Sequence, residues 1–152
     1  QNENALRQGL KALELGPEFL IARHWLGIAY IANGKYDDAI TVAEGGLKLS
    51  PQHPEMLFVI GRAKAQKGDR RGAEDVIRQL QEISKTQYVR TYWVACIYAA
   101  LGDKTRTLEA LEKSFEDKDI FLPRIKSDPM MDPVRNEAQF KSLLQRMNIP
   151  VK

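Results

Sequence analysis

Few side chains in this sequence of 152 residues are placed so that they could do chemistry together. Histidine occurs twice, as His24 in a helical segment and as His53 between two prolines, and no nucleophile is spaced to pair with either. We expect both on the surface or in a groove. Cys96 lies in an apolar helical segment, which is typical of a buried thiol rather than a nucleophile. These patterns predict no catalytic site, no metal site and no cofactor, and therefore no enzyme.

Two further patterns are weaker candidates for a ligand site. The acidic stretch 116–119 lacks the spacing of a calcium-binding loop, so we expect a frayed helix end there. The pair Gly45-Gly46 lies inside a helical segment and has no phosphate-loop context. We interpret the pair as a point where a helix bends or is packed closely by another.

The composition is that of an ordinary folded chain, with 43% hydrophobic and 28% charged residues and a net charge of +3. No apolar run approaches the ~18 residues that span a bilayer, and no signal peptide is visible. A lone cysteine favours a reducing compartment, so we expect a cytoplasmic location. The basic cluster in 62–71 has no aromatic residues interleaved, which argues against nucleic-acid binding. The chain does not begin with Met, and we expect it to be a piece of a longer protein.

A regular repeat dominates the elements that would position any site. Gly34, Gly68 and Gly102 recur at intervals of 34 residues, and each comes after an apolar helical segment. Such a period predicts stacked pairs of helices, because neither helix of a pair can bury its apolar stripe alone. The small residues at one position of each first helix, Gly27, Gly61 and Ala95, would let its partner approach closely. With this period and residue order the chain resembles the tetratricopeptide repeat family.

The resemblance implies an all-α fold, a right-handed α-α superhelix (a solenoid) with a C-terminal helical cap. The expected organisation is a solenoid over 1–119 and a capping segment over 120–152. Within the solenoid we expect the second helix of a truncated repeat (1–17) and three repeats (20–53, 54–87 and 88–119). In the capping segment, Asn136 and Gln139 begin an amphipathic helix with Phe140 on its apolar face.

The sequence departs from the family pattern at several positions. Arg23, Leu57 and Thr91 occupy the position where the family has a tryptophan in the first helix. The segments 99–103, 110–113 and 128–147, with Asp-Pro at 128–129 and 132–133, are similar to the C-terminal repeat modules of bacterial signalling proteins. Those proteins are winged-helix regulators, class III adenylate cyclases and serine/threonine kinases. This second resemblance implies an alternative function as a regulatory or dimerising module of such a protein.

The family resemblance also implies where a partner would bind. First helices line the concave face of such a solenoid, and here they carry many apolar and aromatic residues. Because tryptophan, tyrosine and arginine dominate the energetics of interfaces, we expect a protein or peptide partner to contact Trp25, Ile28, Phe58, Arg62, Tyr92 and Trp93. The alternative is that these residues form a core, covered by the C-terminal segment or by a missing N-terminal helix.

Two further expectations concern the partner. The family's clamp for the acidic C-termini of chaperones needs Lys, Asn and Arg, but the corresponding positions hold His24, Ile28, Val59, Val89 and Trp93. Binding of chaperone tails is therefore not expected. The first helix lacks its pair, so its apolar residues Leu6, Leu10 and Leu13 could instead mediate a homodimer.

Overall fold

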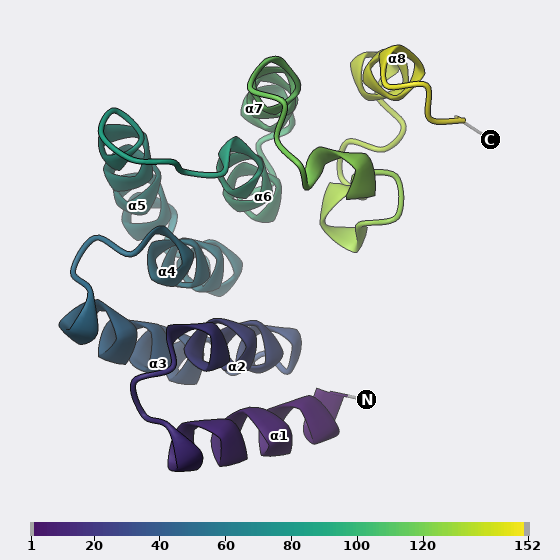
Figure 1. The fold of residues 1–152 in the computed structure, drawn as a ribbon. Coiled ribbons are helices and arrows are strands. Elements are labelled where there is room, and N and C mark those ends of the chain that lie inside the picture. Colours follow the sequence, from purple (N-terminus) through teal and green to yellow (C-terminus); the bar gives the residue numbers. More distant parts are fainter. Residues whose placement is uncertain (1, 151–152) are drawn as a thin grey trace. The chain divides into compact units, whose positions relative to one another are not determined.

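The computed structural model describes residues 2–150, and within that range every regular element is a helix (Figure 1). This confirms the predicted all-α class and is consistent with an α-α solenoid. The chain divides into two compact units, unit 1 with residues 1–89 and unit 2 with residues 90–152. The repeat boundaries 20–53, 54–87 and 88–119 stay a prediction.

Unit 1 is a series of antiparallel helices, each packed on the next (Figure 1). Its elements are α1 (Asn2–Leu15), α2 (Leu20–Ala32), α3 (Tyr36–Leu49), α4 (Pro54–Lys67) and α5 (Arg70–Ile83). α2 also packs on α4, so the first helices of two successive pairs are neighbours. In the second helices of these pairs, the small residues Ala39 and Ala73 are fully buried.

Glycines allow the closest approaches between these helices. A Cβ atom added at Gly27 of α2 would lie 2.5 Å from Val59 Cγ1 of α4. One added at Gly46 of α3 would lie 2.5 Å from the sulfur of the buried Met56. Because real Cβ atoms do not approach other atoms so closely, Gly27 sets the spacing of α2 and α4, and Gly46 leaves room for the Met56 side chain. The interpretation of Gly46 as a close-packing site agrees with this geometry.

The three periodic glycines end their helices in the same way. Gly34, Gly68 and Gly102 have φ angles of +71°, +92° and +71°. At the first of them, Gly34 N–H donates to Ile31 O at 3.0 Å and Lys35 N–H donates to Tyr30 O at 2.9 Å. This is the Schellman arrangement, which satisfies the last carbonyl groups of a helix and needs a left-handed residue. Equivalent bonds are formed at Gly68 and Gly102, so the 34-residue period repeats a helix stop.

The second helices of the pairs begin less uniformly. Asp69 accepts a hydrogen bond from Gly72 N at 2.9 Å, and Asp103 accepts one from Arg106 N at 3.0 Å. Both are side-chain N-caps, which typically stabilise a helix by about 1 kcal/mol. Lys35 occupies the corresponding position before α3 and supplies no side-chain cap.

Unit 2 contains one helix pair and the C-terminal segment. Its elements are α6 (Thr91–Ala100), α7 (Lys104–Glu116), the short 3-10 helices η1 (Leu122–Arg124) and η2 (Pro129–Met131), and α8 (Ala138–Arg146). The side chains of Ile125, Met131, Val134 and Phe140 are fully buried. The C-terminal segment therefore supplies much of the core of unit 2.

The last helix is attached to α7 by both charge and packing. α8 carries the predicted apolar face, with Phe140, Leu143 and Leu144 buried. Arg146 of α8 forms an ion pair with Glu112 of α7, and its guanidinium carbon lies 5.0 Å from the ring centroid of Phe115. An amphipathic helix thus lies near the end of the chain much as predicted.

One expectation about local structure was wrong. The acidic stretch expected to fray is ordered by tertiary contacts, since Asp119 is 5% exposed and accepts hydrogen bonds from the backbone N–H groups of Tyr92 and Phe121 at 3.1 and 2.9 Å. Lys118, just before Asp119, takes a left-handed φ of +54°. The spacing of these acidic residues argues against a calcium-binding loop. It gives no sign that Asp119 accepts a hydrogen bond from the first turn of α6, because that helix is distant in the sequence.

Candidate functional site

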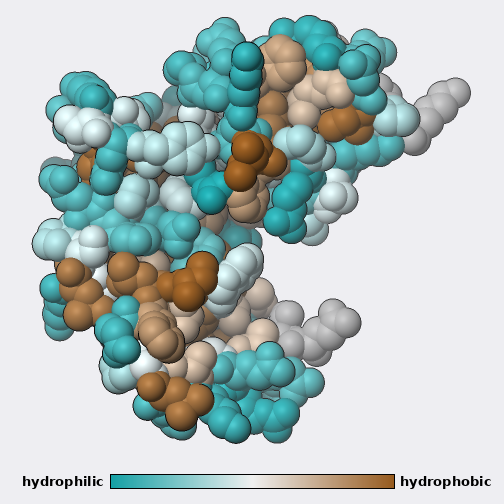
Figure 2. All heavy atoms as spheres, in the orientation of Figure 1, coloured by the Kyte–Doolittle hydropathy of each residue, from teal (hydrophilic) through white to brown (hydrophobic). Residues whose placement is uncertain are grey.

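An apolar stripe runs along the exposed side of α2. Ile21 and Trp25 are 57% and 59% exposed, Ile28 is half-buried and Ala32 is exposed. Their spacing of four, three and four residues places them on one face of the helix. In Figure 2, hydrophobic residues interrupt the otherwise hydrophilic surface of unit 1 in the region of α2 and α3. Exposed apolar residues that gather on one helix face are typical of an interaction surface.

The Trp25 side chain contacts another aromatic ring, which in turn stacks on a third. The His24 and Trp25 ring centroids are 5.1 Å apart, with an edge-to-face angle of 83°. His24 in turn stacks on Phe58 of α4, with 6.1 Å between centroids and 26° between planes. Phe58 is 5% exposed and His24 is also buried. Trp25 is therefore an exposed indole whose neighbouring ring, His24, is itself stacked on Phe58. Of the two expected positions for His24, on the surface or in a groove, burial excludes the first.

The neighbouring helix α4, which packs on α2, carries two charged residues on one side. Glu55 in its first turn and Arg62 two turns later are both half-buried. They are seven residues apart, so they lie on the same side of α4. The contact of Gly27 with Val59 and the stack of His24 on Phe58 hold α2 and α4 in register. Unit 1 thus presents an apolar helix face next to a charged one.

The two predicted site residues of unit 2 are buried. Tyr92 is 4% exposed, and its hydroxyl donates a hydrogen bond to Asp128 at 2.7 Å. Burial raises the pKa of this phenol above its ordinary value of 10.0, and Cys96 and Asp128 raise it further. Trp93 is buried as well, with the Arg90 guanidinium 5.4 Å from its ring centroid.

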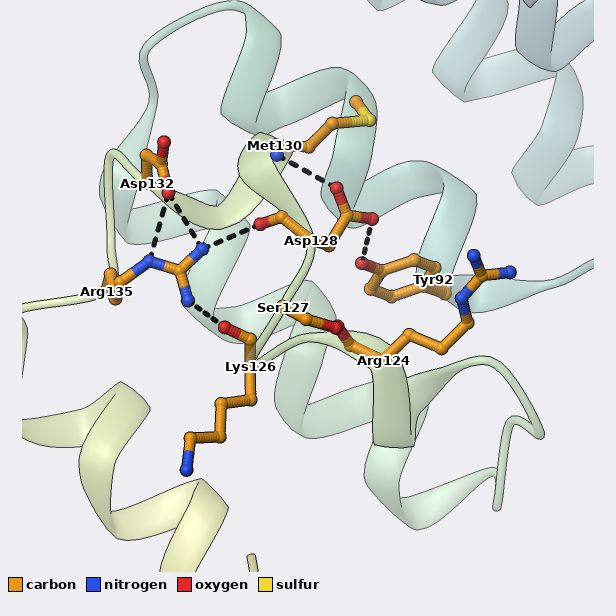
Figure 3. Close-up of polar contacts among 8 residues, drawn as sticks. All are labelled: Tyr92, Arg124, Lys126, Ser127, Asp128, Met130, Asp132 and Arg135. Carbon is orange, nitrogen blue, oxygen red and sulfur yellow. Dashed lines mark hydrogen bonds and ion pairs between the residues drawn. The ribbon is translucent and has the colours of Figure 1, made fainter. Parts of the chain in front are cut away.

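The loop that carries Asp128 is held in place by Arg135 (Figure 3). The guanidinium donates to Asp132 Oδ1 at 3.0 and 2.7 Å, to Asp128 O at 2.8 Å, and to Lys126 O. Asp128 Oδ1 also accepts from Met130 N at 2.9 Å, which starts η2. The two Asp-Pro sequences therefore form an ordered loop that presents a carboxylate to Tyr92.

The predicted site residues fall into two groups. Trp25, Ile28, Phe58 and Arg62 belong to the packed helices α2 and α4, with Trp25 exposed and Phe58 buried. Tyr92 and Trp93 belong to α6 in unit 2 and are covered, which was the alternative expectation for the first helices. The contact between Tyr92 and Asp128 has no local sequence pattern, because the two residues are 36 positions apart.

The described residues hold little that could support other functions. No group of three or more His, Cys, Asp or Glu side chains among them could hold a metal ion. Cys96 is buried. None of the helices between residues 2 and 150 is both long enough and apolar enough to cross a membrane. Self-association through α1 stays a prediction, with Leu10 exposed and Leu6 and Leu13 half-buried.

Comparison with known families agrees with this architecture. A family model described as tetratricopeptide repeat matches residues 3–54 and again residues 25–87, together more than half of the chain. No curated protein matches the chain. The matched residues are those of α1–α5, whose paired helices and recurring glycine stops have the 34-residue period. The chain therefore belongs to the tetratricopeptide repeat family.

Proposed function

We propose that this protein binds a peptide or helical segment of a partner protein on the exposed face of α2 and α4, without catalysis. Tetratricopeptide repeats generally mediate protein–protein interaction, and the family is typically non-catalytic. The observation that carries the proposal is the exposure of Trp25 and Ile21 on one face of a first helix, at 59% and 57%.

The geometry of Trp25 supports a role as the main anchor. Tryptophan is enriched among the residues that dominate binding energy, and such residues act best when they are rigid before binding. The buried His24 ring, which stacks on Phe58, limits the orientations of the indole. Ile21 and Ile28 flank it one turn away on either side, so a ligand side chain could be enclosed by three apolar groups.

Unit 1 is the better location for this site than the face of α6. The Tyr92 hydroxyl already donates a hydrogen bond to Asp128, and the segment after α7 packs on α6. Displacing that segment would expose Met131 and Val134, which are fully buried. Tyr92 and Trp93 are therefore assigned to the stability of unit 2, and the proposed contacts are Ile21, Trp25, Ile28 and Arg62.

The test is a selection from a displayed library of random dodecapeptides, combined with binding measurements on Trp25→Ala. Loss of an anchor tryptophan should weaken the selected peptides by about 30-fold or more, the scale of a hot-spot residue. Tyr88→Ala is the matched control, because Tyr88 is an exposed aromatic residue of unit 1 at 67% exposure and is not on α2. Peptides that bind wild type and Trp25→Ala equally would contradict the proposed site, and a library that yields no binder would contradict the function.

A further inference from the structure

The charges beside the apolar stripe indicate what kind of segment it takes. Glu55 is half-buried in the first turn of α4, and it makes no hydrogen bond or ion pair with another residue of the described range 2–150. A carboxylate that is partly removed from water and has no partner gains from a cation supplied by a ligand. No other role is apparent for this charge beyond its favourable position at a helix N-terminus.

The register of the two helices places Glu55 at one end of the stripe. His24 stacks on Phe58, and Gly27 lies against Val59, so residue numbers rise together along α2 and α4. Residues three positions apart share a helix face. Ile21 lies three residues before His24 on α2, and Glu55 lies three residues before Phe58 on α4. The register of the stacked pair therefore pairs Ile21 with Glu55. This register predicts that the Glu55 carboxylate lies near Ile21, the first exposed apolar residue of the stripe.

The opposite charge stands at the other end. Arg62 lies seven residues after Glu55, which is roughly 10 Å along a helix. A basic group of the ligand would meet a carboxylate near Ile21 but a guanidinium farther along the stripe. The surface consequently distinguishes the two directions in which an apolar segment could lie on it.

We propose that the α2 stripe takes an apolar peptide segment that carries a lysine or arginine at one end, with that basic side chain paired to Glu55. This inference rests on the proposed function and adds the chemistry and the direction of the ligand. Trp25 supplies the apolar anchor, whereas Glu55 selects the charge beside it. Arg62 disfavours the reversed orientation by placing like charges together.

The test repeats the dodecapeptide selection on wild type and on Glu55→Lys, with Glu44→Lys as the control. Glu44 is an exposed residue of α3, so the control makes the same change in net charge away from the stripe. Wild type and Glu44→Lys should enrich peptides with Lys or Arg next to apolar residues, and Glu55→Lys should enrich Asp or Glu there. For the best wild-type peptide, replacing its basic residue by glutamate should weaken binding to wild type by about tenfold and strengthen binding to Glu55→Lys.

The outcomes separate this inference from the proposed function. Peptides that depend on Trp25 but show the same charge preference on wild type and Glu55→Lys would overturn the role of Glu55 and leave the site standing. A preference for acidic peptides on wild type would overturn it too. If no peptide depends on Trp25, both the site and the charge preference fall. Circular dichroism of each variant shows whether it has kept its fold.

Discussion

At the scale of single residues, departures from the family pattern are accommodated by particular neighbours. Arg23 stands at the family's tryptophan position, and its Nε and Nη2 atoms donate to Pro17 O at 3.1 and 2.8 Å. Its Nη1 atom donates to Val42 O of α3 at 3.2 Å. A Cβ atom at Gly45 would lie 2.5 Å from that Nη1 atom, so the glycine leaves room for the guanidinium. The Gly45-Gly46 pair thus serves two close contacts, one to Arg23 and one to Met56.

Gly27→Ala should destabilise unit 1 because the new methyl group would overlap Val59. Valine is stiff about χ1 and buried here, so the strain should cost about 1–3 kcal/mol and exceed the gain in helix propensity of about 1 kcal/mol. The measurement is the free energy of unfolding in urea. The matched variant is Gly27→Ala combined with Val59→Ala, in which the overlap is relieved. A double-mutant cycle without any coupling between positions 27 and 59 would contradict this packing.

At the scale of elements, α6 depends on residues far along the chain to begin. Its N-cap residue Arg90 makes no side-chain cap. Instead, Asp119 accepts from the Tyr92 N–H, and the Thr91 hydroxyl donates to Asp117 Oδ2 at 2.6 Å. Carboxylates are favourable at a helix N-terminus because the first N–H groups are unpaired and the helix dipole is positive there. The turn after α7 therefore closes the start of α6.

Asp119→Ala should lower the free energy of unfolding by about 2 kcal/mol. It would leave the backbone N–H groups of Tyr92 and Phe121 without an acceptor, and a buried unpaired donor costs about 1–3 kcal/mol. Hydrogen exchange of the first turn of α6 should accelerate more than that of α7. Asp119→Asn, which keeps one acceptor oxygen, should lie between wild type and alanine. Equal exchange in the wild type and Asp119→Ala would show that the cap is dispensable.

Low pH should weaken the contacts between the turn after α7 and the start of α6 by protonating the carboxylate of Asp117. The Lys113 ammonium, at 2.6 Å, and the Thr91 hydroxyl lower the pKa of this carboxyl below its ordinary value of 3.8. A lowered folded-state pKa contributes stability that is present above 3.8 and is lost as the pH falls through the folded-state value. The advantage of wild type over Asp117→Asn in unfolding free energy should therefore shrink below about pH 4 and stay constant near neutrality. An advantage that is the same at both pH values would refute the linkage.

At the scale of the whole molecule, the two units use their first helices differently. In unit 1 the exposed face of α2 stays available, with Trp25 at its centre. In unit 2 the face of α6 is covered by the chain's own C-terminal segment, and Tyr92 is bonded to Asp128. A first helix can therefore present a surface or form a core, depending on whether a later segment of the chain packs over it.

High pH should destabilise the fold of unit 2, because it favours deprotonation of Tyr92. Its raised pKa means that the neutral phenol is favoured in the folded state, so its contribution to stability is present below 10.0 and is lost as the pH rises above that value. Tyrosinate absorbance that is present in wild type and missing in Tyr92→Phe should appear only together with the loss of helical circular dichroism. A Tyr92-dependent absorbance step near pH 10 in a folded protein would contradict the burial and the bond to Asp128.

Much of the fold could be predicted because its signals are local. The positive φ angles of Gly34, Gly68 and Gly102 and the stops that they form repeat in the sequence. The candidate site was predictable only in part. Trp25 and Phe58 were both predicted to contact a partner from their first helices, yet one is exposed and the other buried. Which of them is covered depends on the neighbouring helices, and no short sequence window contains that information.

The sequence by itself determined the helical period, the helix stops and the family, because backbone conformation and apolar spacing act over a few residues. Tertiary structure alone decided which aromatic residues remain exposed, how the acidic turn caps α6, and that Asp128 reaches Tyr92. The polar contacts among them join residues 26 to 36 positions apart. Their formation results from the burial of apolar side chains such as Ile125 and Val134, which brings distant polar groups together and obliges them to pair.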